Sequence, residues 1–165
     1  MNADAFRQFY DYHFAENHKI WNSYVTPLSY EQFTQDLGYS HGSVRNQVVH
    51  LIGADELWFS ELQNFKPSEP LPSANFDDRK NIRTRWDKVE QNMRNYLAKL
   101  RDDMLFVAPI EEPEEDKNLV VWQVLLHVVN HGTDHRAQLL RLLNDLGLKT
   151  TSQDYIFYVF DNLPK

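Results

Sequence analysis

The chain has 165 residues, of which 42% are hydrophobic and 25% are charged, a size and balance typical of one globular domain spanning residues 1–165. Its formal net charge of −7 argues against nucleic acid or an anionic membrane surface as the main partner, and no apolar run approaches the roughly 20 residues that span a bilayer. The absence of cysteine excludes disulfides, cysteine-based zinc sites and thiol nucleophiles. Since no secretion signal is visible either, we expect a cytoplasmic protein.

Hydrophobic residues repeat at helical spacing in the first third of the chain. The first predicted helix covers residues 3–24 and ends before Pro27, because the residue preceding a proline disfavours helical geometry. Residues 29–33 predict a short serine-capped turn. Ser43 is a suitable N-cap, so a second helix is predicted over about 44–64.

Two further helices follow a proline-rich connection. Aspartates at the start of the segment 77–103 complement a helix dipole, which predicts the third helix there. The fourth runs from about 119 to 145, with Gly147 as its C-cap. The tail 150–165 fits either a short helix or a strand, and its aromatic residues must pack on something. The sequence therefore predicts an all-α, up-down-type four-helix bundle with a short C-terminal segment.

The stretch LVVWQVLLHVVNHGTDHRAQLL places three of the seven histidines four residues apart. On a helix, such side chains share a face with Cβ atoms about 5–6 Å apart, so His131 and His135 can each bring a ring nitrogen to one metal ion. A third ligand must come from another element, and His50 is the best candidate because it lies in an apolar part of the second helix. A single core histidine is more often satisfied by hydrogen bonds alone, but burying several imidazoles is costly without a shared purpose.

The other histidines carry weaker signals. The direction of His127 has drifted by about 40° from that of His131, which leaves it a pocket role or a packing role. His13 and His18 do not share a helix face and are interpreted as surface or rim residues, and His41 is interpreted as a polar loop residue. HGTDH lacks the glutamate of a zinc peptidase, and no Glu-x-x-His motif of a di-iron bundle occurs.

These residues resemble a known family. NHGTDHRAQ, preceded by WQVLLHVV, is similar to the closing helix of the DinB/YfiT-like proteins, four-helix-bundle metalloproteins that include bacterial thiol S-transferases. LSYEQFTQDLGYSHGSVRNQVVHLIGADELWFSEL resembles the second helix of that family, and DYHFAENHKIW resembles its first helix, with a characteristic asparagine at Asn17. The resemblance implies that the metal ligands are His50, His131 and His135. Ala137 stands where the family usually has glycine, which leaves the ligands unaffected.

Three neutral imidazoles with an open position form a site of catalytic type, and zinc or nickel suits such ligands. The nucleophile would be a metal-held water or thiolate, and the residues themselves do not select between them, nor do they identify a catalytic side chain. The resemblance implies transfer of a low-molecular-weight thiol onto small electrophiles in detoxification or stress response. A metal-dependent hydrolase, a non-catalytic metal-binding or stress-related bundle, and a bundle without metal are the alternatives.

Several neighbours are candidates for holding the ligands or lining a substrate pocket. They are Trp58, Gln138 and Asn17, together with His127. Aromatic residues at helical spacing, including Tyr10 and Phe14, are more often core than pocket. The aromatic tail and the family resemblance both predict a homodimer.

Overall fold

The computed structural model describes residues 1–72 and 77–163, which contain helices and no strand. The long helices are α1 (Ala3–Ile20), α3 (Val44–Glu61), α4 (Arg79–Lys99) and α5 (Val121–Asp145). The short ones are α2 (Tyr30–Thr34) and α6 (Tyr155–Asp161), with a π-helical turn η1 (Trp21–Val25) after α1 and a 3-10 turn η2 (Asp102–Phe106) after α4.

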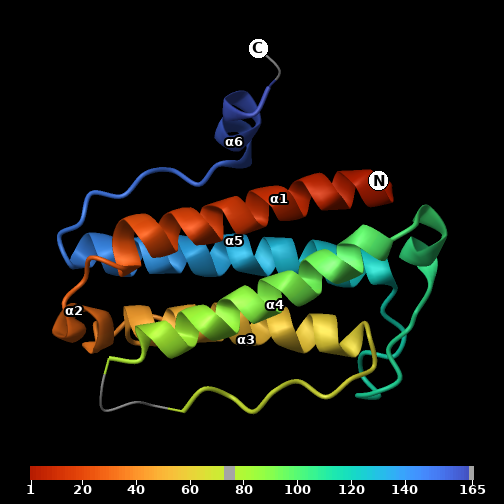
Figure 1. Cartoon of the computed structure of the whole chain (residues 1–165), viewed down its shortest axis with the longest axis horizontal. Coiled ribbons are helices and arrows are strands. Elements are labelled where there is room, and N and C mark those ends of the chain that lie inside the picture. Colours follow the sequence, from red (N-terminus) through yellow and green to blue (C-terminus); the bar gives the residue numbers. More distant parts are fainter. Residues whose placement is uncertain (73–76, 164–165) are drawn as a thin grey trace.

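The four long helices form the predicted all-α bundle. Helix α1 packs against α4 and α5, and α3 packs against the same two helices, so each long helix has two long neighbours. Figure 1 shows α1 and α5 running in one direction and α3 and α4 in the other. Because α3 and α4 are parallel, the chain between them returns along the bundle, and this crossover distinguishes the fold from a simple up-down-up-down bundle.

Local capping residues explain where the helices begin and end. The side chain of Ser43 accepts a hydrogen bond from the backbone of Asn46 at 3.1 Å, and Ser29 forms a reciprocal capping box with Gln32, as predicted. Gly147 has a φ of +85°, the left-handed conformation expected after the end of α5. The predicted ranges of the second, third and fourth helices are two to six residues longer than those observed.

The core fills the space between the long helices, and the apolar stripe of α4 from Ile82 to Leu97 is buried in it. On α3, by contrast, Leu57 is 42% exposed. The tail forms a helix, α6, which stands away from the bundle in Figure 1. It packs on α1 through stacking of Tyr155 on Phe9, with ring centroids 4.9 Å apart, whereas Ile156, Phe157 and Phe160 are exposed.

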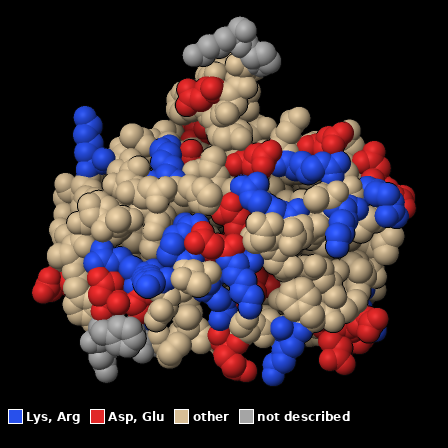
Figure 2. Space-filling view, viewed as in Figure 1, with Lys and Arg blue, Asp and Glu red and all other residues tan. Residues whose placement is uncertain are grey.

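Charged residues of both signs are interspersed on the face of the molecule shown in Figure 2. The ion pairs include a buried one, in which Arg45 of α3 binds Asp78 at the start of α4 with a closest distance of 2.6 Å. This pair holds the beginnings of two parallel helices together. None of the described helices has the length and apolar character needed to cross a membrane.

Candidate metal centre

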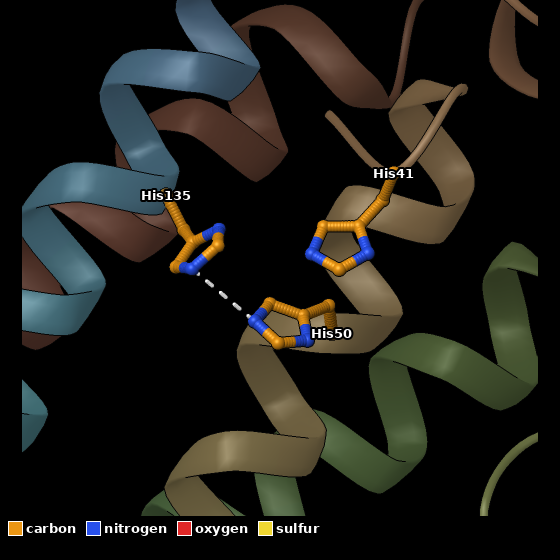
Figure 3. A group of neighbouring side chains, drawn as sticks. All are labelled: His41, His50 and His135. Atoms are coloured by element: carbon orange, nitrogen blue, oxygen red, sulfur yellow. Dashed lines mark hydrogen bonds between the residues drawn. The ribbon is translucent and has the colours of Figure 1, made fainter. Parts of the chain in front are cut away.

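Four imidazoles gather where α3, α5 and the loop before α3 meet, and Figure 3 shows three of them, those of His41, His50 and His135. We call them the imidazole cluster: His41 from the loop, His50 from α3, and His131 and His135 from α5. Nε2 of His50 lies 3.3 Å from Nε2 of His131 and 3.3 Å from Nε2 of His135. The three histidines selected by spacing in the sequence are therefore adjacent in the structure.

The distances between these nitrogens suit a metal ion. Two nitrogen ligands at the usual zinc distance in a tetrahedral site lie about 3.3–3.4 Å apart. Both nitrogen pairs that involve His50 match this value. A second set also fits, because His41, His50 and His135 each offer one ring nitrogen, and these three atoms lie within 4.8 Å of one another. The structure thus contains a possible three-histidine metal site, with a fourth imidazole beside it.

The electrostatics of the cluster keep the rings of His50, His131 and His135 neutral. Burial, followed by the charges of His41, His135 and His131, lowers the pKa of His50 to about 4. Burial, followed by the charges of His135 and His127, likewise lowers the pKa of His131 to about 4. The pKa of His135 is also lowered, mainly by burial. Because only a neutral imidazole can donate its lone pair to a metal, the cluster can bind a cation at neutral pH without first losing protons.

Gln47 is a partner of the cluster that the sequence analysis missed. It lies on α3, one turn before His50, and its side chain is fully buried. Its amide nitrogen lies 2.8 Å from Nδ1 of His135 and donates to the backbone oxygen of His135 at 3.1 Å. Its amide oxygen accepts from the hydroxyl of Ser40 at 2.9 Å. Gln47 therefore fixes the orientation of the His135 ring and ties α3 to α5.

The predicted neighbours lie at the edge of the cluster. The ring of His127 is exposed, with its centroid 5.5 Å from that of His131, and Trp58 packs edge-on against it at 5.0 Å. Gln138 contacts the hydroxyl of Ser40 and donates to Asp134 at 2.9 Å. Trp58 and His127 thus form one wall beside the candidate site, and Gln138 reaches the loop that carries His41.

A buried polar network lies among α1, α3 and α5. We define it as His13, Asn17, Asp55 and Arg136. Nη1 of Arg136 donates to Nδ1 of His13 at 3.1 Å and to the side-chain oxygen of Asn17 at 3.0 Å, and Nε2 of His13 lies 3.2 Å from Asp55. Since arginine only donates, Nδ1 of His13 must accept, and its Nε2–H donates to the carboxylate.

This network corrects two interpretations. His13 is fully buried, so its assignment to the surface or rim was wrong; its partners lie 42 and 123 residues away in the sequence. Asn17, a candidate partner of the ligands, bonds instead to Arg136, the residue after His135. Gly132 makes this arrangement possible, because a Cβ atom there would lie 2.5 Å from Cε1 of His13.

The aromatic residues considered as pocket walls divide into two groups. Tyr10 and Phe14 are buried in the core, and the hydroxyl of Tyr10 donates to the backbone oxygen of Leu125 at 3.0 Å. Trp58 is only half-buried. A cavity of about 350 Å³ lies on the other side of α3, between Val49, Leu57 and Leu71, and is not lined by the imidazole cluster.

Comparison with known proteins agrees with this architecture. The DinB family profile matches residues 1–162. The chain belongs to the DinB family. A relative in this family is Protein DinB of Bacillus subtilis (strain 168), which is 25% identical over 167 residues, covering 97% of this chain and 96% of that protein. Family membership and the imidazole cluster together identify a DinB-like protein with a possible metal site, and the residue Ala137 that departs from the family pattern is exposed to solvent.

Proposed function

We propose that this DinB-family protein binds one divalent cation through Nε2 of His50, His131 and His135, and that it is a metal-dependent thiol S-transferase. The observation that carries the proposal is the pair of 3.3 Å distances from His50 to the two histidines of α5, which match a tetrahedral site. Zinc or nickel is the expected ion, since imidazole suits both, and the tetrahedral spacing favours zinc.

A bound ion would supply a Lewis acid that stabilises the thiolate of a small thiol or lowers the pKa of a water molecule. The residues of the chain do the remaining work. The neutral imidazoles present their lone pairs, and Gln47 holds the His135 ring in place. The half-buried Trp58 and the exposed His127 provide an aromatic wall against which a small electrophile can pack. The cysteine-free chain offers no thiol of its own, so in a thiol transfer the nucleophile would be a low-molecular-weight thiol.

Metal analysis tests the site. Protein purified without a histidine tag is expected to contain about one equivalent of zinc or nickel per chain. The His131→Ala variant should lose it while keeping the helical circular dichroism of the wild type, because His131 is only half-buried. Wild-type protein that cannot be loaded with stoichiometric metal would overturn the proposal.

Turnover tests the reaction. Metal-loaded protein is incubated with a small thiol and a haloarene, and thioether formation is compared with that of the His50→Ala variant. Faster turnover by the wild type supports the transferase. Ester hydrolysis without thiol would identify the alternative, a metal-dependent hydrolase. Equal rates for wild type and variant in both assays would favour a non-catalytic, stress-related metal-binding bundle.

We further propose that the protein is a homodimer in which a second copy covers α6. This helix stands away from the bundle in Figure 1, and Ile156, Phe157 and Phe160 are 50%, 51% and 60% exposed. A contiguous apolar surface of this kind is typical of an interface. Light scattering should report a dimer for the wild type and a monomer for Phe160→Glu. The control is Phe106→Glu, which changes an exposed phenylalanine of η2, outside α6; a wild-type monomer would refute the proposal.

A further inference from the structure

His41 is the member of the imidazole cluster that neither the spacing argument nor the family resemblance selects. Its ring stacks on His50, with centroids 4.0 Å apart and an interplanar angle of 24°, and its centroid lies 5.5 Å from that of His135. One of its nitrogens is within 4.8 Å of donor nitrogens of both rings. The His41 side chain is exposed, while the other three histidines of the cluster are half-buried. Its ring faces His50 and His135 from the loop before α3 (Figure 3), and it is the exposed member of the cluster.

The loop that carries His41 is held in one conformation by its own hydrogen bonds. The backbone nitrogen of Leu37 donates to the oxygen of Gly42 at 2.8 Å, and that of Gly42 donates to Tyr39 at 2.9 Å. Gly38 and Gly42 have φ values of +68° and +84°, a conformation that favours glycine. The loop is thus built as a compact unit, which places residue 41 at a defined position.

Side chains next to His41 fasten this loop to both helices of the site. The hydroxyl of Ser40 donates to Gln47 of α3 at 2.9 Å and contacts Gln138 of α5. The side-chain nitrogen of Asn46 donates to the backbone oxygen of His41 at 3.2 Å. His41 is therefore anchored through its backbone and through its neighbour Ser40, and its imidazole ring is held against the cluster by the stacking on His50.

The position of His41 has a direct chemical consequence. One ring nitrogen each of His41, His50 and His135 lies within 4.8 Å of the other two, a spacing at which the three could hold one metal ion. His41 reaches this position from an exposed loop, whereas the other three histidines of the cluster are half-buried on α3 and α5. His41 is therefore the member of the cluster placed to add a ligand to the site from its solvent side.

We propose that His41 is an exchangeable fourth ligand that occupies the open position of the metal site and leaves it when an external thiol binds. This inference rests on the proposed metal site and adds its regulation. The tethered imidazole competes with the thiol for one position. If it holds the position nine-tenths of the time, it weakens thiol binding about tenfold and strengthens metal binding by the same factor of about ten.

The test compares wild-type protein with His41→Ala, both loaded with cobalt(II), whose visible spectrum reports the ligand number. The control is His18→Ala, which removes an imidazole that is paired with Glu90 of α4, outside the cluster. We measure cobalt affinity by chelator competition and 2-mercaptoethanol affinity from the thiolate-to-cobalt absorption band. His41→Ala should bind cobalt about tenfold more weakly and the thiol about tenfold more tightly, and His18→Ala should change neither.

Opposite changes are the decisive signature, because a residue that only holds the loop together would weaken both equilibria or neither. Unchanged or jointly weakened affinities in His41→Ala would overturn the role of His41 alone. Wild-type protein that binds no cobalt would overturn the metal site and the role of His41 together. Circular dichroism of His41→Ala should match the wild type, since the residue is exposed.

Discussion

Metal affinity should change little between pH 7 and pH 5, because two ligand histidines stay neutral over this range. Burial and neighbouring histidines lower the pKa of both His50 and His131 to about 4. At pH 5, the partial protonation of two ligands with a pKa near 4 weakens metal binding by a factor of about 1.2. The protonation of two ordinary histidines, with pKa values near 6.5, would weaken metal binding by a factor of about 1000. The lowered pKa of His135 acts in the same direction.

The assay is a competition titration of zinc between the metal-free protein and a chelator of known pH dependence, at pH 7, 6 and 5. Circular dichroism at each pH confirms that the fold persists. His127→Ala is the control, and it should shift the curve only slightly, because the charge of His127 is a minor cause of the lowered pKa of His131. A loss of several hundredfold in affinity between pH 7 and pH 5 would refute the reasoning.

Three further predictions concern the metal-free fold and the support of the site. In urea unfolding experiments, the free energy of unfolding should decrease as the pH falls from about 6.5 toward 4. The reason is that the histidines of the unfolded chain bind protons in this range, whereas His50 and His131 of the folded chain do not yet bind them. Gln47→Leu should weaken zinc binding about 10–100-fold. The Gln47→Glu variant should bind zinc more tightly than the leucine variant, because a carboxylate can accept a hydrogen bond from Nδ1–H of His135. Equal zinc affinities of the two variants in a chelator titration would contradict this. Gly132→Ala should destabilise the fold by about 1–3 kcal/mol, because the new Cβ atom would clash with His13. Gly53→Ala should stabilise the fold by about 0.5–1 kcal/mol, because no atom lies within 4 Å of the new Cβ atom. Thermal denaturation of both variants measures these changes.

The helices could be predicted from the sequence because each buries one stripe of residues, and a stripe is a local pattern. Their ends were less predictable. Helix α4 was expected to begin at Asp77, but it begins at Arg79, because the Asp78 side chain binds Arg45 of α3 instead of capping the helix. At its other end, Leu100 has an extended backbone with a ψ of 129°, which stops the helix before the expected residue 103.

The candidate site was predictable to the extent that it is local. His131 and His135 share a helix face by their spacing alone, and His50 stands out in an apolar stretch of α3. His41 and His13 were misread because their surroundings come from distant parts of the chain. The loop position of His41 depends on contacts of Ser40 with α5, and the burial of His13 depends on partners in α3 and α5.

The buried polar network and the imidazole cluster are coupled through the geometry of α5. His131 precedes Gly132, which lies against His13, and His135 precedes Arg136, which binds His13 and Asn17 of α1. Any rotation of α5 about its axis would therefore disturb the network and the cluster together. Gln47 adds a direct bond from α3 to His135. These contacts belong to the packing of α1, α3 and α5, so the fold itself contributes to the orientation of the rings. The packing of the helices thus brings His50, His131 and His135 together at one place. The only exposed imidazole of the cluster, His41, belongs to a loop and not to a helix of the bundle.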